Sequence, residues 1–99
     1  MKKVELEARF LKALAHPVRL DIVKKLKAGS RCVCELFDES EFSQPNVSQH
    51  LRILKDAGVL ESHKDGNRTI YGIKHDKITR LLELAGEITK TELRSLLEE

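Results

Sequence analysis

Two short strand-like runs joined by a tight turn constrain this chain more than any other feature of its sequence. The runs cover residues 59–64 and 68–73, and Asp65-Gly66-Asn67 lies between them. Asp-Gly and Gly-Asn pairs are typical of tight hairpin turns, because these turns need positive φ angles. Apolar residues recur with a helical period elsewhere in the chain, so we predict one β-hairpin set among helices.

Four helices are predicted before the hairpin. The first covers residues 3–15, and the second begins at Pro17, whose fixed φ suits the first helical position, and ends at Gly29 as a left-handed cap. A short third helix covers residues 31–37 and follows Ser30 as its N-cap.

The fourth helix carries the clearest apolar face. We expect it to begin after Ser43 as its N-cap, to bury its residues at positions 47, 51 and 54, and to end at Gly58. A final helix begins near Asp76. It either continues to Leu97 or breaks at Thr89-Lys90-Thr91-Glu92, which has the pattern of a capping box.

Length and composition fit one small domain spanning residues 1–99, which gains burial by pairing with a copy of itself. Aromatic residues make up 4 % of the chain, so the core must consist of Leu, Ile, Val and Ala. No segment has the length of a transmembrane span or the h-region of a signal peptide, so we expect a cytoplasmic protein with no membrane contact. In that compartment Cys32 and Cys34 are expected to be free thiols or metal ligands rather than a structural disulfide.

A short helix pair followed by a hairpin is the arrangement of a winged helix-turn-helix, in which the second helix of the pair enters the DNA major groove. We therefore predict a mainly α (α+β) fold in the order α-α-α-α-β-β-α. Because the net charge is only +2, the positions of the charges must matter more than their sum. The candidate DNA-binding residues are Ser43, Gln44, Asn46, Ser48, Gln49, Arg52, Lys55, Lys64, Asn67 and Arg68.

Amide side chains are concentrated in these same two elements. Three of the four lie in the first two turns of the fourth helix, and the fourth is Asn67 in the hairpin turn. A turn attracts Asn in any case, whereas Gln44 and Gln49 favour base reading, since an amide can both donate to and accept from adenine. Lys64 and Arg68 either bind phosphate or the minor groove, or keep a solvated hairpin tip soluble.

Four motifs in one order resemble the ArsR/SmtB family of metal-responsive repressors, over roughly residues 10–75. They are Leu-Ala-His-Pro-Val-Arg-Leu (14–20), Cys-Val-Cys-Glu-Leu (32–36), Ser-Gln-Pro-Asn-Val-Ser-Gln-His-Leu (43–51) and Leu-Lys-Asp-Ala-Gly-Val-Leu (54–60). The resemblance implies a homodimer formed by the first and last helices, an imperfectly palindromic DNA operator, and release when a toxic ion or thiol-reactive signal binds. It also places Gln44, Ser48 and Gln49 at the family's major-groove positions.

The resemblance further implies a sensor site at Cys32 and Cys34. Arsenic sensors of the family carry Cys-Val-Cys-Asp-Leu-Cys, and here Phe37 occupies the third cysteine position. Thiolates are soft ligands, so As(III) or Sb(III) is the favoured inducer, followed by other soft metal ions. The third ligand would be an exogenous thiol, water or a group from elsewhere. The family's zinc site is rejected, because Ile88 and Thr91 fall where its second ligand pair would be.

Helical geometry predicts how such a site would act. Two cysteines two positions apart on a helix point about 200° from each other, so one ion could hold both only by unwinding the third helix and displacing Gln44 and Gln49. The alternatives are that the cysteines are inert core residues, or that they respond to oxidation or persulfide. His16, His50 and His63 are interpreted as structural.

Other classes of function find less support in the sequence. There is no glycine-rich phosphate loop, no Cys-x-x-Cys pair and no recognisable Ser/His/Asp grouping, so we predict that the chain is not an enzyme. No cofactor is expected to be required for DNA binding. A winged-helix protein-interaction module without an inducer is the remaining alternative.

Overall fold

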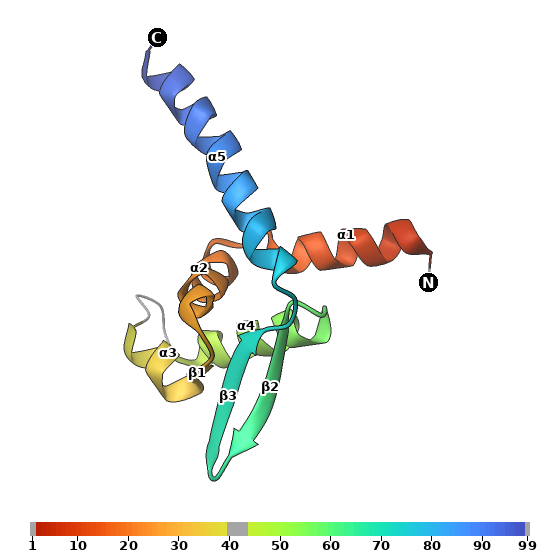
Figure 1. Cartoon of the computed structure of the whole chain (residues 1–99), viewed down its shortest axis with the longest axis vertical. Coiled ribbons are helices and arrows are strands. Elements are labelled where there is room, and N and C mark those ends of the chain that lie inside the picture. Colours follow the sequence, from red (N-terminus) through yellow and green to blue (C-terminus); the bar gives the residue numbers. More distant parts are fainter. Residues whose placement is uncertain (1, 40–43, 99) are drawn as a thin grey trace.

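The computed structural model describes the backbone of residues 2–39 and 44–98 and the side chains of residues 2–36 and 46–98. The described elements are α1 (Lys3–Leu14), α2 (Pro17–Lys25), the 3₁₀ turn η1 (Leu26–Ala28), β1 (Arg31–Cys32), α3 (Val33–Glu39), α4 (Gln44–Asp56), β2 (Leu60–Asp65), β3 (Arg68–Ile73) and α5 (Lys77–Leu97). Helices α2, α3 and α4 gather beside the hairpin of β2 and β3, while α1 and α5 extend away from this centre (Figure 1). The predicted winged helix-turn-helix is confirmed, and the hairpin of β2 and β3 is its wing.

His16 and Pro17 determine where α2 begins. His16 is the N-cap, and its Nδ1 accepts a hydrogen bond from the backbone N–H of Val18 at 3.1 Å. Pro17 follows in the first turn, where its missing N–H leaves no helical hydrogen bond unmade. After α2 the chain passes through η1 to Gly29, whose φ of 143° and ψ of 169° differ from the left-handed helical cap that we expected.

Helix α4 ends in a Schellman motif at Gly58. The backbone N–H of Gly58 donates to the carbonyl of Lys55 at 3.0 Å, and that of Val59 donates to the carbonyl of Leu54 at 2.9 Å. Gly58 has a φ of 83°, which glycine adopts without the clash that a Cβ would cause. The predicted helix end is confirmed, and β2 starts two residues later, so this motif sets how the wing leaves α4.

The segment before α3 differs from the prediction. Arg31 and Cys32 form strand β1 instead of the first turn of a helix, and they pair antiparallel with Tyr71 and Ile70 of β3. The sheet therefore has three strands in the order β1-β3-β2. Strand pairing with a partner far along the chain overrides the local helical pattern.

A capping box starts α3, and it is centred on Cys32 instead of the predicted Ser30. Cys32 Sγ accepts a hydrogen bond from the backbone N–H of Cys34 at 3.2 Å. The carboxylate of Glu35 accepts one from the backbone N–H of Cys32 at 3.3 Å. This exchange of hydrogen bonds is a variant of the capping box, in which a sulfur replaces the usual hydroxyl and accepts from the second helical residue instead of the third.

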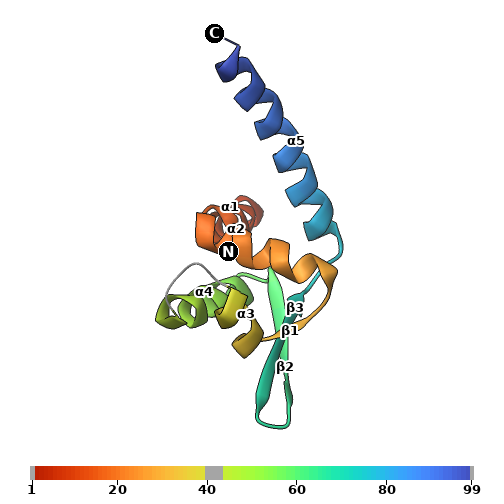
Figure 2. The same cartoon turned by 90° about the vertical axis from the view of Figure 1, so that its left-hand side faces the viewer.

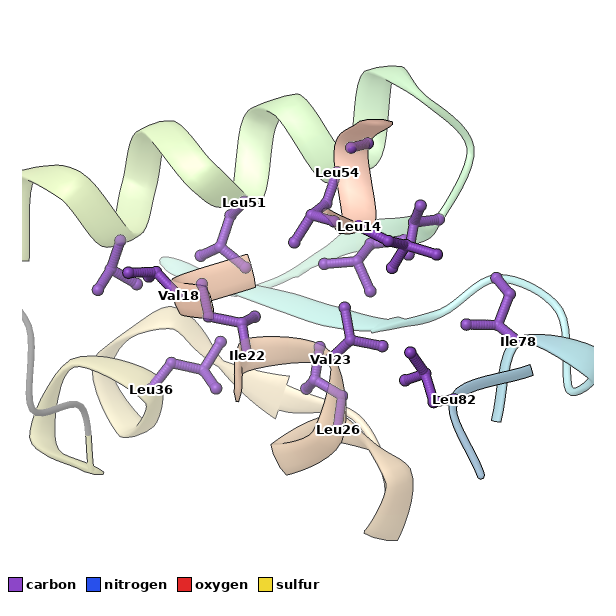
Figure 3. Packing of buried hydrophobic residues seen from close by; sticks show 14 residues of the cluster. Leu14, Val18, Ile22, Val23, Leu26, Leu36, Leu51, Leu54, Ile78 and Leu82 are labelled. Atoms are coloured by element: carbon purple, nitrogen blue, oxygen red, sulfur yellow. The ribbon is translucent and has the colours of Figure 1, made fainter. Parts of the chain in front are cut away.

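One cluster of aliphatic side chains joins the helices to the sheet. Val47, Leu51 and Leu54 of α4 have no exposed surface, as their helical spacing predicted. Figure 3 shows Leu51 and Leu54 directed toward the side chains of α2 and α3, with Ile78 and Leu82 closing one end. The other buried members are Ala13, Leu14, Val18, Ile22, Val23, Leu26, Leu36, Val59 and Leu60.

Large apolar side chains are exposed on α1 and α5. Among the described residues, every exposed large hydrophobic side chain lies on one of these two helices, with exposed fractions from 37 % to 76 %. Helix α5 runs unbroken past Thr89, whose hydroxyl donates to the carbonyls of Ala85 and Gly86 at 3.0 and 3.1 Å instead of capping a new helix. No helix within residues 2–39 and 44–98 combines the length and the apolar character needed to cross a membrane. The exposed residues are Val4, Leu6, Leu11, Leu81, Leu84, Ile88, Leu93, Leu96 and Leu97.

Candidate nucleic-acid interface

Helix α4 presents a polar face opposite its buried one. Ser48, Gln49, Arg52 and Lys55 are exposed, and Asn46 is exposed in the first turn. Gln44 begins the helix, but its side chain lies outside the described residues, and so does the whole of Ser43. The burial of Val47, Leu51 and Leu54 therefore leaves the polar face that base reading requires.

The wing places its predicted residues at the far end of the hairpin. Asp65 pairs with Arg68, and Gly66 with a φ of 64° and Asn67 form the two-residue turn between them. Lys64, Asn67 and Arg68 are all exposed, and the Lys64 ammonium donates to the hydroxyl of Thr69 at 2.8 Å. In Figure 2 the wing projects away from α5, on the same side of the molecule as α3 and α4.

A groove of about 490 Å³ lies between the wing on one side and the β1–α3 segment with Ser48 of α4 on the other. Ser48 contributes to one side, and Asn67 and Arg68 contribute to the other. Three of the residues predicted from the sequence to bind DNA therefore face one groove, although 19 or more positions separate Ser48 from the wing. The other lining residues are Cys32, Val33, Cys34, Thr69 and Tyr71.

Cys32 and Cys34 form a disulfide, whereas we expected free thiols or metal ligands. The two sulfurs meet because Cys32 lies in β1 and only Cys34 lies in α3, with their Cα atoms 5.3 Å apart. The prediction that the cysteines diverge on one helix is thus wrong, and the unwinding that it required loses its geometric basis. Cys32 is buried, Cys34 is exposed, and both residues line the groove.

The donor set around the cysteines is small. Within the described part of the chain, no group of three His, Cys, Asp or Glu side chains is arranged to hold a metal ion. When reduced, the pair would offer two soft thiolates, which fits a metalloid that takes its remaining ligand from solvent.

An Arg19–His50 hydrogen bond, which the sequence did not predict, holds α4 against α2. Arg19 Nε donates to Nδ1 of His50 at 3.1 Å, and Arg19 Nη1 donates to the carbonyl of Ala13 at 3.3 Å. The ring of His16 lies 4.6 Å from that of His50, centroid to centroid. Burial, together with the nearby His16 and Arg19, lowers the pKa of His50 below its usual 6.5, so the ring stays a neutral acceptor. In the sequence, the one sign that Arg19 and His50 matter was that both lie in motifs shared with the ArsR/SmtB family, at 14–20 and 43–51.

Comparison with known proteins agrees with this geometry. Residues 16–62 match the family described as bacterial regulatory protein, arsR family. An uncharacterized HTH-type transcriptional regulator of Methanocaldococcus jannaschii is 40 % identical over 89 residues, which cover 89 % of this chain and 100 % of that protein. The arsenical resistance operon repressor of Staphylococcus xylosus is 38 % identical over 66 residues, covering 67 % of this chain and 64 % of the repressor.

A solved structure extends the likeness to three dimensions. The homodimeric winged helix-turn-helix DNA-binding domain of a Mycobacterium bovis regulator superposes with a TM-score of 0.80 at 30 % identity. The superposition covers 88 % of this chain and 81 % of that domain. The members of the family are DNA-binding regulators and not enzymes. Sequence and fold agree that this chain belongs to the ArsR family of winged helix-turn-helix transcriptional regulators.

Proposed function

We propose that this chain is a single-domain, homodimeric repressor that binds an imperfectly palindromic operator in the cytoplasm and leaves it when an inducer reaches Cys32 and Cys34. The observation that carries the proposal is the groove beside the wing, because it brings Ser48 of α4, Arg68 and the cysteine pair into one place. The apolar residues on α1 and α5 support pairing of two chains at a distance from this groove. The staphylococcal relative, an arsenical resistance repressor, supports the choice of inducer.

In this proposal α4 enters the major groove and the wing contacts the adjacent backbone or minor groove. Gln44, Ser48 and Gln49 read base edges. Arg68 contacts phosphate, so its contribution is sensitive to salt but not to sequence. The supporting contacts come from Ser43, Asn46, Arg52, Lys55, Lys64 and Asn67.

The proposed inducer is a soft metalloid, As(III) first and Sb(III) next. Two thiols displace two hydroxyl groups of arsenite as two water molecules, so the arsenic keeps one hydroxyl or exchanges it for an exogenous thiol. The adduct would lie at the groove that Ser48 and Arg68 also line, next to the surface that DNA would occupy. A coupling of about 1–3 kcal/mol would weaken operator binding some 5–150-fold.

The disulfide favours a second candidate, a thiol-redox repressor of the same fold. Here the two thiols lose two protons and two electrons to a peroxide, which becomes two water molecules. Cys34, the exposed residue of the pair, would react first, and Cys32 would close the bond. In this alternative the oxidised form is the one that releases DNA.

The experiment that separates these candidates is a DNA-binding titration with a duplex covering the promoter of the protein's own gene. Reduced wild type should bind the duplex, and arsenite should release it. Cys32→Ser and Cys34→Ser should bind DNA as wild type does but stay bound in arsenite. If peroxide releases the wild type and arsenite does not, the redox candidate replaces the metalloid candidate.

Two outcomes would contradict the proposal as a whole. If reduced wild type failed to retard its promoter duplex more than a random duplex, the chain would act as a protein-interaction module. If both serine variants still released DNA in arsenite and in peroxide, the cysteines would not be the sensor. A thermal unfolding curve of each variant shows whether folding was preserved.

A further inference from the structure

Glu35 joins the cysteine segment to the wing through one oxygen atom. Its Oε1 accepts a hydrogen bond from the backbone N–H of Cys32 at 3.3 Å. The same Oε1 accepts another from Nη2 of Arg68, 33 positions along the chain, at 3.1 Å. Glu35 thus caps α3 and pairs with the wing arginine at once.

The sheet register explains why these side chains meet. Cys32 of β1 lies opposite Ile70 of β3, so Arg68, two residues before Ile70, points to the same face of the strand as Ile70. Glu35 is in the first turn of α3, which follows β1 directly. The strand pairing therefore delivers the guanidinium of Arg68 to the carboxylate of Glu35.

The Arg68–Glu35 ion pair is open to solvent. The two side chains are 54 % and 48 % exposed, respectively. Exposed pairs of this kind contribute little to stability, because water screens the charges. A DNA phosphate can therefore compete with the carboxylate for the same guanidinium, which binds both kinds of oxygen well.

We propose that Glu35 is a positioning residue that holds Arg68 at the edge of the groove in the free protein and must yield it to phosphate when DNA binds. Because this ion pair must break first, Glu35 reduces the gain in DNA affinity that the contact between Arg68 and phosphate provides. It also lowers the salt dependence, because the released carboxylate attracts a cation while the phosphate loses one. This inference rests on the proposed contact between Arg68 and DNA.

The test is a double-mutant cycle on a random-sequence duplex, with wild type, Glu35→Gln, Arg68→Ala and the double variant. Glutamine keeps the oxygen that accepts from Cys32 but removes the charge that holds Arg68. Glu35→Gln should bind about two- to five-fold more tightly, as expected for loss of a weak exposed pair. The slope of log affinity against log salt should steepen by up to about one. In the Arg68→Ala background the same change should have a clearly smaller effect on both quantities, because no guanidinium is left for Glu35 to hold.

Glu61→Gln is the matched control, because it removes one carboxylate from the exposed side of the wing, opposite Gly72 and away from the turn. It should change affinity less than Glu35→Gln does. Equal tightening by Glu35→Gln with and without Arg68 would overturn the inference, because it would be a general charge effect. The inference would also be overturned if Arg68→Ala weakened DNA binding while Glu35→Gln left the affinity unchanged.

The outcomes separate this inference from the proposal on which it rests. If Arg68→Ala left binding unchanged, the DNA contact of Arg68 would be refuted, and the role of Glu35 with it. Thermal unfolding of each variant reports folding. If Glu35→Gln does not fold, Glu35→Asp serves instead, since the shorter carboxylate keeps the charge but loses the reach to Arg68, and it should also bind more tightly.

Discussion

One arginine, Arg19 of α2, holds α4 in place through its hydrogen bonds. Arg19 donates to His50 from α2 and to the carbonyl of Ala13 at the end of α1, so three helices meet at one guanidinium. His50 can accept that hydrogen bond only while Nδ1 is unprotonated. The orientation of α4 is therefore tied to the protonation state of one imidazole.

This arrangement predicts a loss of stability in mild acid. Burial lowers the pKa of His50 in the folded chain, so the unfolded chain binds the proton more readily. The neutral His50 ring therefore contributes fully to stability above pH 6.5, and this contribution is lost as the pH falls through the lowered pKa of the folded chain. His50→Asn, which keeps an acceptor near Nδ1, should lose less stability than wild type between pH 7.5 and 5.0 in urea unfolding. His63→Asn, on the exposed side of β2, is the control, and equal losses in wild type and His50→Asn would contradict the prediction.

Base reading should also be visible at the scale of one side chain. Gln49→Ala should cost about 1–3 kcal/mol of discrimination at particular base pairs of the promoter duplex, and Gln44→Ala should do the same. Binding to random DNA should change little, because these amides are assigned to bases and not to phosphate. Fluorescence titrations with the promoter and a shuffled duplex measure both. Equal weakening on the two duplexes would remove α4 from its assigned role.

At the scale of helices and strands, two glycines show how backbone conformation contributes to stability, one at the end of α4 and one inside α5. Gly58 has a φ of 83°, whereas Gly86 lies inside α5, and a Cβ at either position would meet nothing within 4 Å. Any effect of substitution therefore comes from the backbone and not from collisions within the chain.

Opposite signs are expected for alanine at these two positions. Gly58→Ala should destabilise the protein by about 1 kcal/mol, since a Cβ strains the left-handed conformation. Gly86→Ala should stabilise it by about 0.8–1 kcal/mol through helix propensity. Both are measured by chemical unfolding at one fixed protein concentration. Loss of stability in Gly86→Ala would indicate that a partner chain packs closely against that position.

Elements with local signals could be predicted from the sequence, and elements that depend on distant partners could not. Pro17 and Gly58 mark helix ends through their own backbone preferences, so the predicted boundaries at these positions agree with the structure. Arg31 and Cys32 become a strand only because Tyr71 and Ile70 pair with them, and no pattern near Cys32 reveals this.

In the candidate site, too, features with local signals could be predicted and contacts between distant residues could not. The polar face of α4 could be predicted because it is the complement of the buried face. The hydrogen bonds of Arg68 to Glu35 and of Arg19 to His50 link positions 33 and 31 apart, which requires the fold to be known. The disulfide was missed for the same reason, since the error about β1 placed both cysteines on one helix.

At the scale of the whole molecule, the extents of 53 × 36 × 23 Å reflect two helices that leave the core. Beyond Leu82, the large apolar residues of α5 are exposed in the part of the chain that the structure describes, and most of its charged residues lie along another side of the helix. We assign the apolar residues to the interface of the proposed dimer.

Substitutions on two faces of α5 test this assignment. Ile88 is 64 % exposed, and Ile88→Asp should shift the chain toward monomer and weaken promoter binding at least ten-fold, because a buried unpaired charge costs several kcal/mol. Lys90→Asp, about 200° around the helix from Ile88, should leave the dimer intact. Sedimentation velocity at micromolar concentration measures both. A wild type that sediments as a monomer, with and without DNA, would refute the dimer.

The exposed apolar residues on α1 and α5 also determine how repression would depend on the concentration of this protein in a cell. In the proposed dimer, each DNA-binding unit consumes two chains, so below the dimer dissociation constant its abundance rises with the square of chain concentration. A two-fold fall in synthesis would then remove about three quarters of the active units. Repression would weaken steeply with dilution during growth, even before any inducer arrived.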